Sequence, residues 1–140
     1  MPGLIGWIKM KEYDIAPKQV WRVAGRLLHD VVYEPGIEEK NEWVYASAET
    51  PEHREWFVQW IESKGIEPAT RIWVIVTNPA EDTKELNWCE FLSRWTEFLS
   101  DSDLKVADKA FTWVLEYKSQ RVARFGRKPR IQQVVDGHPH

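Results

Sequence analysis

The chain has 140 residues, of which 43% are hydrophobic and 29% are charged, and its formal net charge is −3. This length fits one ordinary domain, and the composition is typical of a globular protein rather than a disordered one. No apolar run approaches the roughly 20 residues of a membrane span, and the first ten residues lack a basic leader and a small-residue cleavage site, so we expect neither a membrane segment nor a signal peptide.

The single cysteine, Cys89, cannot form an internal disulfide. A chain without disulfides is typical of a reducing compartment, so the sequence predicts a cytoplasmic protein. No histidine lies near Cys89 in the sequence, which favours a buried structural thiol over a nucleophile.

The first half of the chain alternates between strand and helix patterns. Residues 4–10 predict an opening strand. Helix-start signals at Asp14 to Pro17 precede apolar residues at helical spacing, and Pro35-Gly36 ends that element. Residues 43–46 predict a second strand. The segment Thr50-Pro51-Glu52 combines a cap, a first-turn proline and a first-turn acid, so it predicts a helix that closes at Lys64-Gly65.

Residues 71–77 give the clearest strand, with five consecutive β-formers and no alternation. A strand covered on both faces has this pattern, so we place it in the centre of the sheet. Asp82 or Thr83 then predicts the start of another helix. Its apolar residues recur at intervals of three and four, and they are Trp88, Phe91, Leu92, Trp95, Phe98 and Leu99.

The segment 103–125 fits two patterns. Phe111, Trp113, Leu115 and Tyr117 alternate as in a strand, whereas other apolar residues fit a helix. Ser102 as a cap and Gly126 as a terminator favour the helix. The sequence therefore predicts an α/β or α+β fold, in which a small sheet of three to four strands is covered by about four helices. A single domain spans 1–128, and 129–140 form a polar, flexible tail.

Nine tryptophans are more than a domain of this size is expected to bury completely. Trp88 and Trp95 are seven residues apart on one helical face, which predicts core positions. Trp43, Trp56 and Trp60 are expected to be partly exposed, where aromatic residues anchor a partner. The leading hypothesis is a non-enzymatic binding or regulatory protein that engages a protein partner, or a second copy of itself, through a Trp-rich surface.

The charges of the chain are separated along the sequence. Residues 104–140 carry a net charge of +5 and residues 1–103 a net charge of −8. A basic stretch on the predicted last helix suggests a nucleic-acid-associated protein as an alternative function. Two simpler interpretations stay open, in which these cations stabilise the helix end or contact the acidic remainder of this or a second subunit. The basic stretch comprises Lys118, Arg121, Arg124, Arg127, Lys128 and Arg130.

A second alternative is a small hydrolase or metal-dependent enzyme. Glu49, Glu52, His53 and Asp82 follow predicted strands and could converge at one edge of the sheet. Acidic residues that precede helices also occur simply as caps. The sequence shows no phosphate-binding glycine pattern and no zinc spacing, so no cofactor and no metal are expected.

Overall fold

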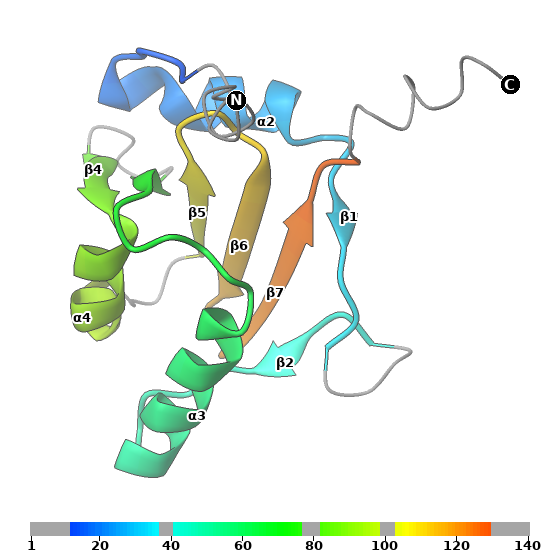
Figure 1. The fold of residues 1–140 in the computed structure, drawn as a ribbon, viewed down its shortest axis with the longest axis vertical. Coiled ribbons are helices and arrows are strands. Elements are labelled where there is room, and N and C mark those ends of the chain that lie inside the picture. Colours follow the sequence, from blue (N-terminus) through cyan, green and yellow to red (C-terminus); the bar gives the residue numbers. More distant parts are fainter. Residues whose placement is uncertain (1–11, 37–40, 77–81, 99–102, 130–140) are drawn as a thin grey trace, which may run out of the picture.

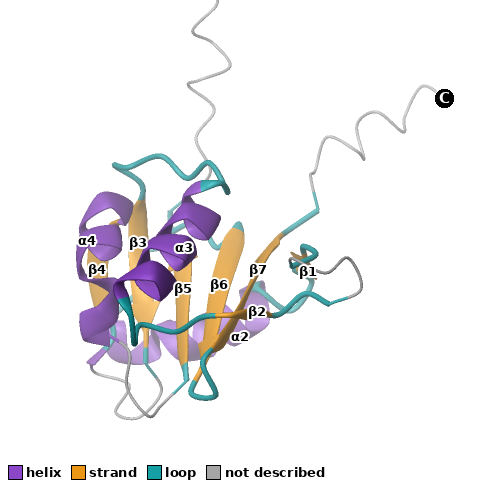
Figure 2. Ribbon diagram, turned by 90° about the horizontal axis from the view of Figure 1, so that it is seen from below, coloured by secondary structure: helices purple, strands orange, loops and turns teal. Residues whose placement is uncertain are grey.

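The computed structural model describes residues 12–36, 41–76, 82–98 and 103–129, and these residues form one curled sheet with helices on both faces (Figures 1 and 2). The strands lie in the order β1-β7-β6-β5-β3-β4, and β2 also pairs with β7. All six pairings are antiparallel. The strands are β1 Val32–Tyr33, β2 Val44–Tyr45, β3 Arg71–Ile75, β4 Lys84–Asn87, β5 Leu104–Asp108, β6 Trp113–Lys118 and β7 Val122–Arg127.

Three α-helices lie within these residues, namely α2 (Val20–Leu27), α3 (Pro51–Glu62) and α4 (Trp88–Phe98), and a 3₁₀ turn at Pro17–Gln19 leads into α2. The predicted fold, a sheet of three to four strands under about four helices, is therefore wrong. The sheet has seven strands and curls into half a barrel (Figure 2).

The main error concerns the segment 103–125, which forms β5, β6 and part of β7 instead of a helix. Its two turns contain no glycine or asparagine. Instead, Phe111 and Arg121 adopt left-handed backbone conformations, with φ of 55° and 68°. Such conformations are uncommon outside glycine and need support from the surrounding structure. Phe111 receives that support because its side chain is completely buried.

Each face of the sheet has its own hydrophobic cluster. On one face, Trp113, Leu115 and Tyr117 of β6 belong to a cluster with buried residues of α3 and α4. On the other face, Val114 belongs to a cluster with buried residues of α2. Figure 2 shows α3 and α4 on one side of the strands and α2 behind them. Because both faces are covered, β3 is apolar from Ile72 to Ile75 and β6 from Trp113 to Leu115, without the alternation that marks a half-exposed strand.

Local signals place the helices more accurately. The side-chain oxygen of Thr50 accepts a hydrogen bond from the backbone N–H of His53 at 3.1 Å, and Pro51 opens α3 as predicted. Helix α4 begins later than predicted, because β4 lies between Thr83 and the helix. Its cap is Asn87, whose side-chain oxygen accepts from the N–H of Glu90 at 2.7 Å.

Three further expectations have definite outcomes. β3 lies between β5 and β4, one strand from the edge of the sheet and not at its centre. Cys89 is exposed on α4, so the prediction of a buried thiol is wrong. No helix in the described part of the chain is long and apolar enough to cross a bilayer. The predicted strand at 4–10 and the tail beyond Pro129 lie outside the described residues.

Asp108 holds the turn between β5 and β6. Its carboxylate accepts hydrogen bonds from the Thr112 N–H at 2.6 Å, the Thr112 hydroxyl at 2.5 Å and the Trp113 N–H at 3.3 Å. Burial nevertheless outweighs these hydrogen bonds and raises the pKa of Asp108 above its ordinary value. Charge on this side chain is therefore a cost to the folded state at neutral pH.

Replacement of Asp108 with asparagine is accordingly expected to leave the free energy of unfolding at pH 7 unchanged or to raise it by about 1 kcal/mol. Because the pKa of Asp108 is raised in the folded state, the protonated carboxyl stabilises the wild-type fold relative to the charged one. This stabilisation is fully present in acid and is lost as the pH rises through the folded-state pKa. The gap between Asp108→Asn and the wild type should therefore close below about pH 4. Urea titrations of both proteins at several pH values measure this difference in the free energy of unfolding. A clear loss of stability in Asp108→Asn at pH 7 would show that the turn requires the charge.

Candidate functional site

The tryptophans divide into buried and partly exposed groups. Trp73, Trp88, Trp95 and Trp113 are buried, with at most 5% of their surface exposed. The other four described tryptophans, Trp21, Trp43, Trp56 and Trp60, all retain exposed surface, and Trp21 is 40% exposed. Trp7 lies outside the described residues. The expectation that the interior does not absorb every indole is confirmed for the described residues, and the predicted core positions of Trp88 and Trp95 are confirmed as well.

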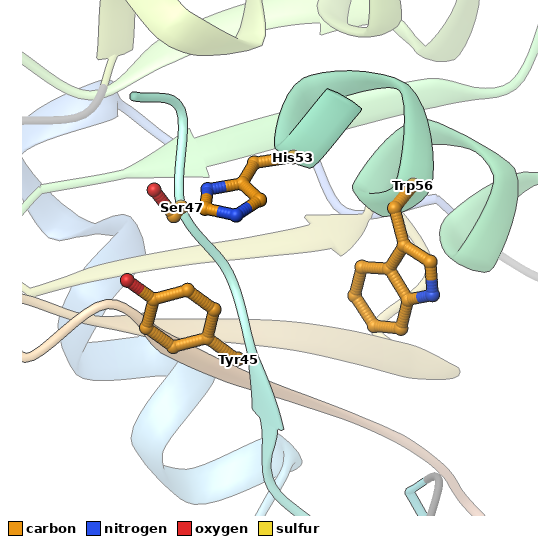
Figure 3. Close-up of a pocket in the computed structure, with 4 residues that line it drawn as sticks. All are labelled: Tyr45, Ser47, His53 and Trp56. Atoms are coloured by element: carbon orange, nitrogen blue, oxygen red, sulfur yellow. The ribbon is translucent and has the colours of Figure 1, made fainter. Parts of the chain in front are cut away.

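A pocket of about 170 Å³ lies where β2 meets the first turns of α3, and Figure 3 shows its four lining residues. They are Tyr45, Ser47, His53 and Trp56, and we call this cavity the α3 pocket. Three of these four residues are aromatic, and the lining surface is almost entirely apolar. An open apolar pocket with a few polar atoms is the usual form of a binding site.

The position of Tyr45 in this pocket follows from strand pairing. β2 pairs with β7 so that Val44 lies opposite Ala123 and Tyr45 opposite Val122. Val44 is buried in the core, and Tyr45, the next residue, points outward with 54% of its surface exposed. This alternation is the ordinary two-residue period of a strand.

His53 and Trp56 reach the pocket because they lie one turn apart on α3. Phe57 and Ile61 are the buried residues of this helix, and they fix which face packs on the sheet. His53, Trp56 and Trp60 are therefore rotated toward the rim of that face. The predicted partial exposure of Trp56 and Trp60 arises in this way.

The polar atoms of the pocket are few. The His53 ring packs edge-on against Tyr45, with ring centroids 5.7 Å apart. Its Nδ1 atom is buried and has no hydrogen-bond partner within the described part of the chain. A buried polar atom without a partner costs about 1–3 kcal/mol. Ser47 is also buried, and its hydroxyl oxygen accepts a hydrogen bond from the N–H of Glu49 at 3.1 Å.

Aromatic surface continues from the pocket along α3. The rings of Trp56 and Trp60 are stacked, with centroids 6.3 Å apart and an interplanar angle of 5°. The ammonium group of Lys64 lies 5.0 Å from the centre of the Trp60 ring, which is a favourable cation–π distance. Stacked indoles lose little conformational entropy on binding, so this row of rings is suited to contact with a partner.

The rim of the α3 pocket carries two exposed carboxylates, and the guanidinium of Arg54, between them in sequence, donates to the backbone oxygen of Ala48 at 2.7 Å. Glu52 and Glu55 are exposed, and each lies one position before a pocket residue on α3. Among the described residues, neither carboxylate forms an ion pair. Two unpaired negative charges beside an apolar pocket favour an occupant flanked by positive charge.

Trp43, the third predicted tryptophan, does not line this pocket. Its ring lies 4.5 Å from the guanidinium of Arg124, which also lies 3.6 Å from the ring of Tyr33. Trp43 lines a separate open groove of about 540 Å³ beside Lys118 and Val122. The structure therefore brings Trp56 and Trp60 together and leaves Trp43 apart from them.

The basic stretch lies on strands and turns, so the predicted helical stripe is wrong. Every described cation in it pairs with a carboxylate of the same chain, which supports contact with the acidic remainder of the protein. The pairs are Lys118–Asp103 at 3.3 Å, Arg121–Glu49, Arg124 with Glu116 at 3.0 Å and with Glu42, Arg127–Glu34 at 2.9 Å and Lys128–Asp30 at 3.8 Å. Arg130 lies outside the described residues. Phosphates of a nucleic acid would have to displace these internal partners.

The most buried of these ion pairs joins Arg124 to Glu116. The carboxylate of Glu116 also accepts a hydrogen bond from the Tyr33 hydroxyl at 2.5 Å. Burial disfavours the charge on Glu116, but the hydrogen bonds from Tyr33 and Arg124 outweigh burial and lower the pKa of the carboxyl. Burial and the same hydrogen bond raise the pKa of Tyr33 well above its usual range. The positive charge of Arg124 is therefore already neutralised within the chain.

The residues of the predicted hydrolase site do not converge. Glu49, Glu52 and His53 lie near the start of α3, but Asp82 lies just before β4 at the opposite edge of the sheet. Four strand spacings separate β7 from β4, roughly 19 Å along a flat sheet. Figure 1 also shows β4 and β2 on opposite sides of the molecule. The described residues contain no cluster of His, Cys, Asp and Glu that could hold a metal ion.

Sequence reasoning missed Tyr45, Ser47 and Trp21. Tyr45 and Ser47 lie in and just after a predicted strand, and no local signal shows which way they face. The sequence did contain a signal for Trp21, because this large apolar residue lies among the cations of the first predicted helix.

Comparison with known proteins finds no matching family model, no matching curated protein and no matching solved structure.

Proposed function

We propose that this chain is a non-enzymatic, cytoplasmic binding protein whose α3 pocket receives an apolar or aromatic side chain of a protein partner. The observation that carries the proposal is the open aromatic pocket between β2 and α3, with the Trp56–Trp60 stack beside it. Tryptophan and tyrosine are the residues that most often dominate binding energy at protein interfaces.

The size and charge of the site define the occupant. A cavity of about 150 Å³ holds one benzene molecule, so the α3 pocket of about 170 Å³ is on the scale of one aromatic or branched aliphatic side chain. The unpaired carboxylates of Glu52 and Glu55 attract lysine or arginine next to that side chain. The proposed ligand is therefore a peptide segment with an apolar anchor between basic residues.

The hydrogen bonds of the pocket favour binding over catalysis. Nucleophilic catalysis by serine requires a base within hydrogen-bond reach and a third group that orients the base. Within the described residues, no hydrogen bond joins Ser47 to His53, and no carboxylate binds the His53 ring. The serine and histidine therefore act as polar atoms in a binding wall.

Selection of random peptides on the immobilised protein tests this proposal. We expect the enriched peptides to carry an aromatic or branched apolar residue flanked by Lys or Arg. Replacement of Trp56 with alanine removes one wall of the pocket and is expected to weaken their binding at least 10-fold, the usual effect of an interface anchor worth more than about 1.4 kcal/mol. Fluorescence anisotropy of labelled peptides measures this change.

Trp21→Ala is the matched control, because it removes an exposed indole on the opposite face of the sheet. This variant is expected to bind the selected peptides as tightly as the wild type does. Peptides that bind wild type and Trp56→Ala equally would contradict the proposal, as would a selection that enriches no peptide.

A further inference from the structure

A row of three cations lies on α2 and on the 3₁₀ turn that leads into it. Lys18, Arg22 and Arg26 follow one another at intervals of four residues and are all exposed. Within the described residues, none of them forms an ion pair. They form a positive stripe along one side of the helix.

Trp21 lies beside this stripe and is the most exposed indole among the described tryptophans, at 40%. The guanidinium of Arg22 lies 5.7 Å from the centre of its ring. The buried residues Val20 and Ala24 hold α2 on the sheet, so Trp21 is anchored on a packed helix with its ring outward. An exposed tryptophan among arginines has the composition of an interface hot spot.

This surface is complementary to the α3 pocket described above. One presents an exposed indole beside a row of three cations, and the other presents an apolar pocket beside two carboxylates; within the described residues none of these five charges forms an ion pair. The helices that carry the two surfaces, α2 and α3, pack in hydrophobic clusters on opposite faces of the sheet. Figure 2 shows α2 behind the strands and α3 in front of them, so the two cannot meet within one chain.

We propose that copies of this chain associate head to tail, with Trp21 of one copy in the α3 pocket of the next. This inference rests on the proposed binding function and names a second copy as the partner. Lys18, Arg22 and Arg26 of the first copy then face Glu52 and Glu55 of the second. The pocket is completed by a residue that the neighbouring copy contributes.

The polar groups are also compatible with this contact. A buried indole N–H needs a hydrogen-bond acceptor. Tyr45 lines the pocket and is 54% exposed, and its hydroxyl oxygen is such an acceptor. The side chains of the pocket therefore offer both an apolar wall and an acceptor to the incoming ring.

The geometry determines the form and strength of the assembly. The two halves of the contact are different surfaces, so the contact is heterologous and each copy keeps one free half for a further copy. One indole and a few exposed charges make an interface smaller than the ~1,200 Å² of a stable complex. We therefore expect a reversible association with a dissociation constant of roughly 0.1–1 mM.

Sedimentation equilibrium over a range of protein concentrations tests the proposal. The wild-type protein is expected to show an average mass that rises with concentration and exceeds that of two copies near 1 mM. Trp21→Ala and Trp56→Ala are each expected to remain monomeric under the same conditions. Added salt is expected to weaken association of the wild type, because exposed charges are screened.

A mixing experiment separates this contact from every symmetric one. Trp21→Ala keeps an intact pocket, and Trp56→Ala keeps an intact Trp21, so an equimolar mixture is expected to form complexes of two copies and none larger. Trp21 is exposed on α2, so its replacement leaves the core unchanged and monomeric behaviour of this variant cannot be attributed to misfolding.

Three outcomes would overturn the inference. They are a wild-type protein that stays monomeric at 1 mM, an association that Trp21→Ala leaves unchanged, and a mixture of the two variants that stays monomeric. Peptide binding to the α3 pocket is a separate measurement. If that binding requires Trp56 while the protein remains monomeric, the proposed function stands and only the self-association fails.

Discussion

Replacement of Trp88 with alanine is expected to lower the free energy of unfolding by about 3–5 kcal/mol, the usual cost of removing a large aromatic side chain from a core. Trp88 is 1% exposed, and its ring lies 5.5 Å from that of Phe91 and 5.4 Å from that of Trp113. It thereby joins α4 to β6. Since small domains are stable by only about 5–15 kcal/mol, this one substitution removes a large share of the total.

Trp56→Ala is the control for Trp88→Ala, because it removes the same side chain from a partly exposed position. Trp56 is only partly buried, so we expect a loss of at most about 2 kcal/mol. Urea denaturation at pH 7 measures both variants. Equal losses for Trp88→Ala and Trp56→Ala would show that Trp56 is a core residue, and the α3 pocket would then have no spare aromatic surface for a partner.

Replacement of Arg124 with alanine is expected to cost about 2–4 kcal/mol, because it leaves the buried carboxylate of Glu116 without its cation. The Glu116 side chain is only 7% exposed. The loss should be largest at neutral pH. A lowered pKa in the folded state means that the ion pair contributes its stability above the unfolded pKa of about 4.3 and loses it as the pH falls through the folded value, so the gap to the wild type closes in acid.

Two variants control for the loss of a side chain at Arg124. Lys118→Ala removes an exposed cation of the same basic stretch and is expected to cost less than about 1 kcal/mol. The double variant Arg124→Met with Glu116→Leu removes both charges and is expected to recover most of the lost stability, because no buried charge is left unpaired. A loss in Arg124→Ala that is the same at every pH would contradict the role assigned to Glu116.

Sequence signals located α3 because the interactions that start and end it are local. Thr50 caps the helix through His53, Pro51 occupies the first turn, and Gly65 adopts a positive φ of 75° just past the end. All of these residues lie within one or two helical turns of the backbone groups at the helix ends that they stabilise. The periodicity of Phe57 and Ile61 then determines which side of the helix Trp56 and Trp60 occupy.

The hairpins formed by β5, β6 and β7 could not be predicted from local sequence signals. Their turns depend on Phe111 and Arg121 in left-handed conformations, which glycine or asparagine would normally indicate in a sequence. Phe111 is held by burial against residues of α2, from more than 80 positions earlier in the chain. Tertiary packing therefore overrides the local preference, and the apolar residues on both faces imitate the pattern of a buried helix.

The candidate site was predictable only in the part that one helix supplies. Trp56 could be expected at the rim, whereas Tyr45 reaches the pocket because β2 pairs with β7, across nearly 80 residues of sequence. The ion pairs of the basic stretch could not be predicted for the same reason. Its cations are visible in the sequence, but their carboxylate partners, such as Glu34 and Glu42, lie far from them along the chain.

The short strands at the two ends of the sheet have a consequence for how copies can meet. β1 and β2 contain two residues each, and β4 contains four, among them Lys84 and Glu85. These strands are short, and β4 is also charged, so they offer too few free backbone groups to template a foreign strand and protect against cross-β aggregation. Crowding of this protein is therefore expected to produce contacts between side chains that dilution reverses, and not a merged fibrillar sheet.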